Sequence, residues 1–318
     1  MNFEQAGALL SSVRESVARV VVGQTDVIDQ TLATFLARGH ALLEGVPGTA
    51  KTLLVRAIAR SLGARYGRVQ FTPDLMPSDV TGVSMLVQSR GAFEFRPGPI
   101  FTDLLLGDEI NRAPPKTQAA LLEAMQERQV TVDGVAHPLG ELFCVLATQN
   151  PVEYEGTYPL PEAQLDRFLL KIRVTYPDRE SELRVLDHHA EGFSVERLDE
   201  LMPPPVTDAA SCAALRELTA TVTVSPEVRG YIATIVRATR EEPAFTLGGS
   251  PRASVALLQV SRAAALLAGR DFVTPDDVKR YAMPVLRHRV LLAADLEVEG
   301  RTADETIAAL LSRVPAPQ

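Results

Sequence analysis

The sequence predicts an α/β domain, built on a mostly parallel sheet flanked by helices, followed by an all-helical domain. Three observations lead to this fold class. Short apolar runs alternate with helical segments between residues 40 and 175, which is typical of parallel sheets covered by helices. Strand patterns largely stop after Tyr176-Pro177-Asp178. The segments that follow have helical spacing.

The first domain is expected to begin with two helices and then to enter the sheet. Apolar residues recur at helical spacing up to about residue 19, and capping side chains start a second helix over 25–37. A third helix over 51–62 is expected to end at Gly63. The candidate buried strands lie at 41–43, 68–71, 104–107, 143–148 and 169–174.

The second domain is expected to contain helices only. They are predicted at 207–220, 226–240, 253–269 and 275–287. The last one has a hydroxyl N-cap at Thr274, proline at its first position and acids in its first turn, all of which favour a helix start. Because the proline-rich stretch 201–205 is stiff and non-helical, we place a boundary near it and divide the chain into residues 1–195 and 196–318.

The composition is that of a globular protein without a disulfide framework. The 318 residues are 46% hydrophobic, and the formal net charge of −8 argues against a general binder of nucleic acid. The two cysteines, Cys144 and Cys212, form no Cys-x-x-Cys pair. The chain begins without a secretory leader pattern, and no apolar run approaches the roughly 20 residues that span a bilayer. We therefore expect a cytoplasmic protein that does not insert into a membrane.

The turn after the first strand has the composition of a phosphate-binding loop. Its residues are Gly45, Val46, Pro47, Gly48, Thr49, Ala50, Lys51 and Thr52. Between a strand and a helix, such a loop turns backbone amides toward an anion, while Lys51 reaches the β- and γ-phosphates and Thr52 binds Mg²⁺. The strict pattern has glycine where this chain has Ala50. Taken alone, the loop also fits a tight turn with Lys51 in solvent.

Two acids at the end of a later strand strengthen the nucleotide interpretation. Asp108 and Glu109 follow the apolar run 104–107. On a parallel strand beside the loop, Asp108 would hold Mg²⁺ through a bound water, and Glu109 would orient and deprotonate the attacking water. In isolation, the same pair is a common acidic strand end. Together with the loop, it predicts a site for ATP and Mg²⁺.

Several longer stretches resemble the MoxR family of AAA+ ATPases, in the clade with an insert in its second helix. The stretches that carry the resemblance are Gln70–Asp79, Gly98–Phe101, Asp108–Gln118, Ala147–Pro151, Leu160–Phe168 and Gly249–Ala253. The family also has alanine before the lysine, as at Ala50. The resemblance implies an AAA+ core, with its phosphate-binding loop and flanked parallel sheet, followed by a helical lid.

The resemblance also implies roles for five further residues. Asn150 matches sensor 1, which helps to place the attacking water, although Asn150-Pro151 alone also fits a turn. Arg167 matches the arginine finger that a neighbouring subunit supplies, and alone also fits a surface ion pair. Arg252 matches sensor 2, expected to reach the γ-phosphate of its own subunit, and alone also fits a surface arginine. Gly23 and Gln24 match the segment that lines the adenine pocket.

Two segments read as β-hairpins that insert into this core. Residues 83–100 contain alternating apolar residues around Gly91, and residues 129–143 contain an Asp-Gly turn at Asp133-Gly134. They resemble the helix-2 insert and the hairpin before sensor 1. By that resemblance they face a central pore or its rim; the alternative is two surface hairpins that only pack on their own subunit.

The sequence thus favours a MoxR-type ATPase that hydrolyses ATP in an oligomeric ring, a hexamer on family grounds. The resemblance implies chaperone-like remodelling of a protein or metalloenzyme client, with a von Willebrand factor A-domain protein as a possible partner, and no nucleic acid. Two alternatives remain open at this point. One is a nucleotide-gated scaffold with little turnover, and the other is a nucleic-acid motor, which the acidic composition disfavours.

Overall fold

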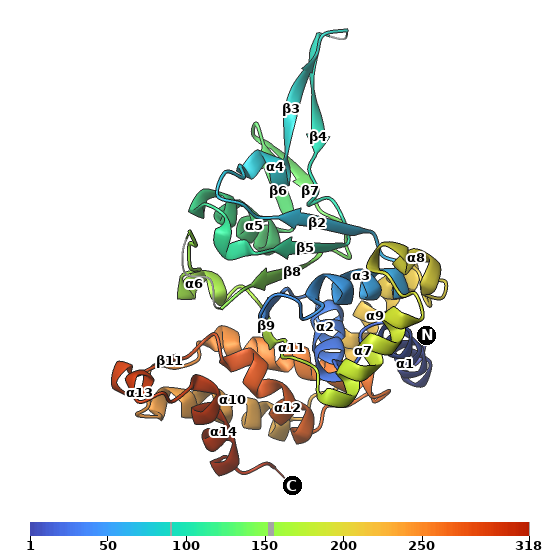
Figure 1. Ribbon diagram of the computed structural model, residues 1–318. Coiled ribbons are helices and arrows are strands. Elements are labelled where there is room, and N and C mark those ends of the chain that lie inside the picture. Colours follow the sequence, from blue (N-terminus) through green and yellow to red (C-terminus); the bar gives the residue numbers. More distant parts are fainter. Residues whose placement is uncertain (90, 152–155, 318) are drawn as a thin grey trace.

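A five-stranded parallel sheet is the centre of the structure, a computed structural model that describes residues 1–89, 91–151 and 156–317 (Figure 1). The strand order is β2-β5-β8-β1-β9, and every neighbouring pair is parallel. The strands are β1 (Ala41–Glu44), β2 (Tyr66–Gln70), β5 (Leu104–Asp108), β8 (Cys144–Gln149) and β9 (Leu170–Arg173). All five predicted strands are confirmed, with small shifts at their ends.

Alternate side chains of the strands enter two separate apolar cores. In β5, Leu104 and Leu106 join one core, and Leu105 joins the other. In β8, Leu146 and Val145 are divided in the same way. This period of two follows from the pleat of a strand, and burial on both faces explains why the central strands are continuous apolar runs.

Helices cover both faces of the sheet. The first core receives side chains from α1 (Phe3–Ala18), α2 (Thr25–Leu36) and α3 (Lys51–Ser61), and the second from α4 (Pro77–Thr81) and α5 (Pro115–Glu127). The connecting elements are η1 (Ile110–Arg112), α6 (Glu162–Leu165), α7 (Arg179–Ala190), η2 (Val195–Arg197) and α8 (Leu198–Leu201). Among the described residues, no helix has both the length and the apolar character needed to cross a bilayer.

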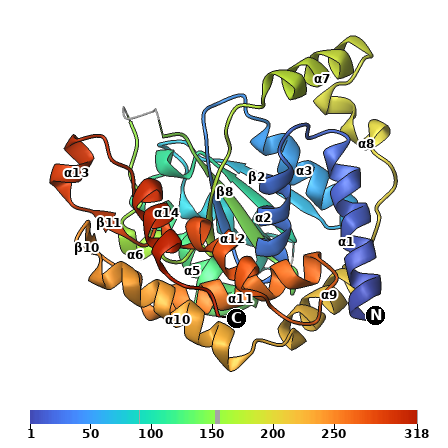
Figure 2. The same cartoon turned by 90° about the horizontal axis from the view of Figure 1, so that it is seen from below.

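The chain after α8 forms a helical lid whose apolar side chains share the first core. Its helices are α9 (Ala209–Thr221), α10 (Pro226–Glu241), α11 (Pro251–Leu267), α12 (Pro275–Leu286), α13 (Ala294–Val298) and α14 (Ala303–Arg313). α11 packs on both α1 and α2 (Figure 2). The expectation of an all-helical lid is wrong in one detail, because β10 (Phe245–Leu247) pairs antiparallel with β11 (Leu291–Leu292). Strands this short carry no readable period-2 pattern.

A buried arginine fixes the lid to the first domain. The Arg216 guanidinium of α9 lies 4.1 Å from the centroid of the Phe35 ring. It donates hydrogen bonds to the carbonyl oxygens of Phe35 (2.8 Å), Glu141 (2.6 Å) and Leu142 (3.2 Å). Burial lowers the pKa of Arg216 to about 10, so the group stays charged at neutral pH. Because all three acceptors belong to the first domain, the contact joins the two parts of the chain.

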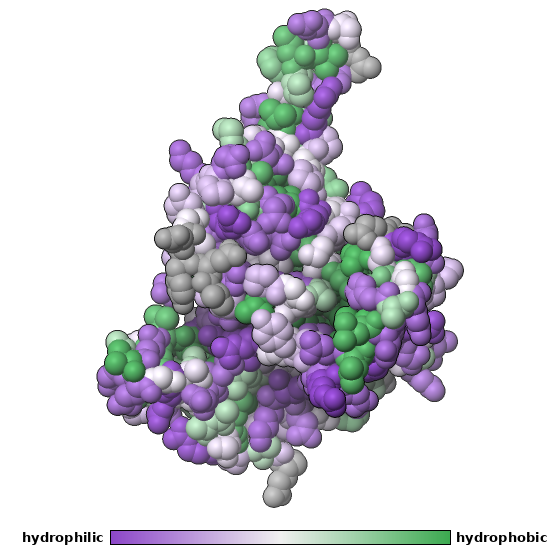
Figure 3. Space-filling view, viewed as in Figure 1, coloured by the Kyte–Doolittle hydropathy of each residue, from purple (hydrophilic) through white to green (hydrophobic). Residues whose placement is uncertain are grey.

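Both predicted hairpins are present. β3 (Gly82–Val87) pairs antiparallel with β4 (Ala92–Pro97), and β6 (Gln129–Val132) pairs with β7 (Val135–Pro138) through the predicted Asp-Gly turn. Arg90 lies outside the described residues. The β3–β4 hairpin projects from the body of the molecule, and its outer part is largely apolar on the visible face (Figure 3). Its exposed apolar side chains include Val83, Met85, Leu86 and Phe93.

Two buried histidines lie at junctions of the fold. His40, just before β1, accepts a hydrogen bond from the Val145 amide through Nδ1 at 2.9 Å, and its Nε2 lies 3.1 Å from the Met125 carbonyl oxygen. If His40 were doubly protonated, its Nδ1–H would face the N–H of Val145, and this hydrogen bond would be lost. Burial accordingly lowers the pKa of His40 to about 3, and it also lowers the pKa of His288 well below the usual value.

These histidines should make the fold sensitive to mild acid. The unfolded chain takes up protons near pH 6.5 and the folded chain does not, so stability is retained above pH 6.5 and falls as the pH drops toward 3. From pH 7.5 to pH 5, each histidine should cost about 2 kcal/mol of unfolding free energy, measured by urea denaturation. In His40→Gln, the loss of unfolding free energy between pH 7.5 and pH 5 should be smaller by about 2 kcal/mol. In His189→Gln, which changes an exposed histidine, the loss should equal that of wild type. An unchanged loss in His40→Gln would contradict this account.

Candidate nucleotide-binding site

A cleft of about 720 Å³ lies where β1, β5 and β8 end, and most of the predicted site residues line it. The strand register accounts for this, because Leu43 pairs with Thr148 and Gly107 with Ala147, so the strands end at one level. The predicted residues in the lining are Gln24, Pro47, Gly48, Thr49, Ala50, Lys51, Thr52, Asp108, Glu109 and Asn150. Open parallel sheets place ligands at this edge.

The phosphate-binding loop lines the cleft and has two residues in an unusual backbone conformation. Gly48 and Ala50 have φ of 82° and 60°, in the left-handed region. A side chain on Gly45 would collide with the Val174 carbonyl oxygen. α3 begins at Lys51, and Ala50, its N-cap, has no side-chain group to satisfy the first-turn amides. Those amides and the helix dipole therefore present positive charge to the cleft.

The ammonium group of Lys51 lies inside the loop. Nζ donates hydrogen bonds to the carbonyl oxygens of Gly45 (2.6 Å) and Val46 (2.8 Å), and it lies 3.3 Å from Thr49 Oγ1. Burial lowers the pKa of Lys51, and the charges of Asp108 and Glu109 act in the opposite direction. The lysine is therefore a partly desolvated cation directed at the centre of the loop.

The acid pair at the tip of β5 is fixed by Thr148 of β8. The Thr148 hydroxyl donates to Asp108 Oδ1 at 2.6 Å and accepts the Glu109 amide at 2.8 Å. The other oxygen of Asp108 accepts a hydrogen bond from Arg68 Nη2 at 2.8 Å. One buried hydroxyl therefore bonds to both the Asp108 carboxylate and the Glu109 backbone amide.

Glu109 has a strained backbone and a tethered carboxylate. Its φ of 58° and ψ of 52° are left-handed, which costs about 1–2 kcal/mol for a residue other than glycine. Glu109 Oε2 accepts hydrogen bonds from Gln70 Nε2 and Arg112 Nη1, each at 3.0 Å. Strain of this kind is concentrated at functional sites, and here it turns the carboxylate at the cleft edge toward β2.

The far end of the cleft has a wall, formed by α7 and Phe193, that the sequence did not identify. Phe193 contacts the rings of both His188 and His189, and Val185 of α7 lies on the same wall. The backbone of Gly23 supports this wall, since a side chain there would collide with Ser181 of α7. The other members of the apolar lining are Val20, Val21, Val22, Tyr176, Pro177 and Val195. A charged helix such as α7 carries no sequence signal for this role.

Two predicted site residues lie elsewhere, in a groove of about 270 Å³. Arg167 and Arg252 line it together with Asp166, and Arg252 Nη1 is 3.7 Å from Asp166 Oδ2. The other arginines in its lining are Arg38, Arg128 and Arg289. Among the described residues, none lines both this groove and the cleft. α11 places Arg252 in this groove with Arg167, and its expected contact with the nucleotide of its own subunit stays a prediction.

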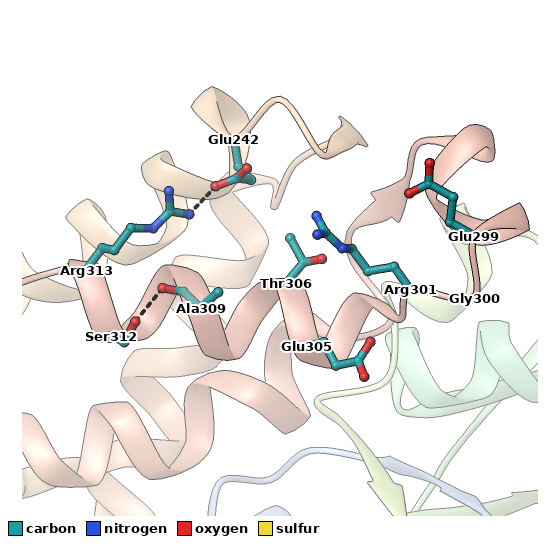
Figure 4. A pocket seen from close by; sticks show the side chains of 9 residues that line it. All are labelled: Glu242, Glu299, Gly300, Arg301, Glu305, Thr306, Ala309, Ser312 and Arg313. Atoms are coloured by element: carbon teal, nitrogen blue, oxygen red, sulfur yellow. Dashed lines mark hydrogen bonds and ion pairs between the residues drawn. The ribbon is translucent and has the colours of Figure 1, made fainter.

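A third hollow, on the lid, lacks the features of the nucleotide cleft. Its volume is about 830 Å³, and acidic and basic side chains alternate around it (Figure 4). Glu242, on one side, is paired with Arg313 of α14. Arg301 and Glu299 stand on the opposite side. With the charges partly neutralised and no phosphate-binding loop, this hollow is not the candidate site.

The cleft suits a triphosphate with a hard divalent cation. Uncapped amides of α3 and Lys51 supply positive charge for phosphates, and the Thr52 hydroxyl and Asp108 carboxylate supply oxygens of the kind that Mg²⁺ prefers. Asn150 adds a buried amide at the end of β8. Mg²⁺ usually takes one or two protein oxygens and completes its shell with phosphate and water, which this donor set permits.

Comparisons with known proteins agree with this geometry. Residues 40–170 match the family described as "ATPase family associated with various cellular activities", and residues 237–310 match the AAA lid domain. In structure, the chain is similar to a candidate ATPase of Cytophaga hutchinsonii, with a TM-score of 0.89 and 40% identity. That similarity covers 99% of this chain and 96% of the other.

Three relatives from bacteria are similar to this chain over most of their length. The chain is 48% identical to the uncharacterised protein YeaC of Bacillus subtilis, over 99% of this chain and 97% of YeaC. It is 41% identical to the chaperone MoxR1 of Mycobacterium tuberculosis, over 95% of this chain and 81% of that protein. Protein MoxR of Methylorubrum extorquens is 32% identical to it, over 95% of this chain and 93% of that protein.

The Thr148 hydroxyl offers a direct test of how the acid pair is held. Thr148→Val keeps the shape of the side chain but removes the hydroxyl that bonds Asp108 Oδ1 and the Glu109 amide, so the free energy of unfolding should fall by about 1–3 kcal/mol. Thr148→Ser keeps the hydroxyl and should lose less, chiefly from the missing methyl group. Chemical denaturation of the two variants measures the difference, and equal losses would show that the hydroxyl does not stabilise the pair.

Proposed function

Because the chain belongs to the MoxR family of AAA+ ATPases, we propose that it binds ATP with Mg²⁺ and hydrolyses the nucleotide to ADP and phosphate. The observation that carries this proposal is the meeting of Lys51, Asp108 and Glu109 in one cleft beside the N-terminus of α3. Phosphoryl transfer needs positioning and charge stabilisation more than covalent chemistry, and these residues provide both.

Each group has a defined task in this mechanism. The loop amides and Lys51 hold the phosphates, and Thr52 and Asp108 hold the Mg²⁺ that neutralises developing charge. Glu109 takes a proton from the attacking water, which Asn150 helps to place. The carboxylate must first leave Gln70 and Arg112, so its tether in this structure is a ground-state arrangement.

We propose that the base of ATP rests at the aromatic end of the cleft. There, Val22 and Val185 offer apolar contacts, and Phe193 with its two histidine neighbours offers flat faces for stacking. Gln24 donates a hydrogen bond to the Thr175 carbonyl at 2.9 Å and closes the cleft on that side. Gln24 thus lines the cleft directly, and Gly23 acts indirectly by allowing close approach of α7.

The separation of Arg167 and Arg252 from the cleft supports an intersubunit site. Both arginines lie in a groove with a surplus of positive charge, which fits the γ-phosphate of a neighbouring subunit. A head-to-tail contact that repeats in this way closes into a ring, which we propose to be a hexamer. The proposed units are residues 1–195, with the cleft, and 196–318, the lid.

We propose that the ring remodels a protein client, in line with the name of the relative MoxR1. The exposed apolar side chains of the β3–β4 hairpin are suited to contact an unfolded or loosely folded segment. A net charge of −8 favours a protein client over a nucleic acid. A von Willebrand factor A-domain protein is the expected accessory partner, and free buried cysteines fit the reducing cytoplasm.

Hydrolysis by purified protein tests the central claim. Wild type should release phosphate from ATP only with Mg²⁺ present. Glu109→Gln should keep nucleotide affinity but lower kcat by about 10²–10⁴-fold, since the general base is lost while the phosphate contacts remain. Glu241→Gln, on the exposed surface of α10, is the matched control and should keep wild-type kcat. If wild type binds nucleotide but does not turn it over, the scaffold alternative replaces this one.

Mixing two inactive variants tests the intersubunit site. In mixed rings, a subunit with Arg167→Ala keeps its own Glu109 and can receive Arg167 from a Glu109→Gln neighbour. Equal mixtures should therefore recover about a quarter of wild-type activity, although each variant alone is nearly inactive. A chain that carries both substitutions should show no such activity, because it has neither its own general base nor an arginine to donate. Failure of the mixture to exceed the separate variants would rule out donation of Arg167 between subunits.

A further inference from the structure

An arginine of the lid forms hydrogen bonds with the segment that carries Arg167. Arg289, which follows α12, donates from Nε to Asp166 Oδ1 at 2.7 Å and from Nη2 to the Phe168 carbonyl at 2.6 Å. It also reaches the carbonyl oxygens of Asp166 (3.3 Å) and Leu169 (3.1 Å). The lid therefore contacts the main chain on both sides of Arg167.

The guanidinium of Arg289 uses its full hydrogen-bonding capacity. Its remaining bond goes to the Val285 carbonyl within the lid, at 2.6 Å. An arginine has five N–H groups in a rigid planar fork, and five acceptors surround this one. The side chain is only 3% exposed, so each bond is protected from water. A lysine would offer three donors from a flexible stem and could not hold the same set.

Asp166 links this buried arginine to the groove surface. One of its carboxylate oxygens pairs with Arg289, and the other faces Arg252 at 3.7 Å. Arg167, the next residue, donates from Nη1 to the Leu122 carbonyl of α5 at 3.0 Å. Two lid arginines thus share the Asp166 carboxylate, and Arg167 is the next residue in the chain.

We infer that Arg289 is a positioning residue that aligns Arg167 for the nucleotide of the neighbouring subunit. The inference rests on the proposed function, in which Arg167 acts between subunits. Arg289 touches neither nucleotide. It sets the path of residues 166–169 and the orientation of Asp166, so that the Arg167 guanidinium is presented to the groove in a fixed orientation.

Arg289→Lys tests this role in the full-length oligomer. Because a displaced arginine finger loses alignment, kcat should fall by about 10–100-fold. KM and the affinity for ATP should stay within about twofold of wild type, since the cleft does not contain this residue. Arg287→Lys is the matched control, because Arg287 bonds Asp304 and the Lys171 carbonyl instead. It should keep wild-type kcat, and a loss of kcat equal to that of Arg289→Lys would overturn the inference.

A double-mutant cycle separates alignment of Arg167 from general damage. If Arg289 acts through Arg167, adding Arg289→Lys to Arg167→Ala should leave the single-turnover rate of Arg167→Ala unchanged within about twofold. Multiplied losses, or lost ATP affinity in Arg289→Lys, would overturn the inference. Should Arg289→Lys fail to fold, Asp166→Asn weakens the same ion pair from the other partner. Adding Asp166→Asn to Arg167→Ala should then leave the single-turnover rate of Arg167→Ala unchanged, and a further loss would overturn the inference.

The cycle also distinguishes the inference from the function on which it rests. If Arg167→Ala alone keeps wild-type kcat, donation of Arg167 between subunits is wrong, and the inference falls with it. If Arg167→Ala is slow but Arg289→Lys is as fast as wild type, only the positioning role is wrong. The expected pattern has both single variants slow, with the double variant no slower than Arg167→Ala.

Discussion

The parallel register of β1, β8 and β5 is the constraint on which the site depends. Since the strands run in one direction and end at one level, the residues after them meet, although they are distant in the chain. The loop before α3 supplies positive charge, and the tip of β5 supplies two carboxylates. Thr148 lies on β8, the strand between them, and holds both acids in place by hydrogen bonds. Without that register, no local motif would assemble a cleft.

The parts of this molecule that could be predicted are those in which a short segment determines its own shape. The phosphate-binding loop, the acid pair and the Asp-Gly hairpin each combine special backbone conformations with characteristic residues. The buried strands were readable because two covered faces require continuous apolar runs.

What could not be predicted depends on how distant segments pack. The place of Arg252 beside Arg167 depends on the lid's orientation, which α11 sets by packing on α1 and α2 and which the motif around Arg252 does not encode. The wall formed by α7 and Phe193 was missed, because a charged helix gives no sign of which face covers a ligand. β10 and β11 are very short strands, and they pair although they are far apart in the sequence.

One apolar core runs without interruption from the sheet into the lid, and Arg216 adds a buried polar tie between them. A lid separated at residue 196 would expose the faces of α11 and α12 to water, and the remaining sheet would lose the cover of its first core. The two halves consequently belong to a single cooperative folding unit. Lineages of such proteins should therefore exchange the projecting β3–β4 hairpin more readily than the lid, because the outer part of this hairpin can be replaced without rebuilding the interior.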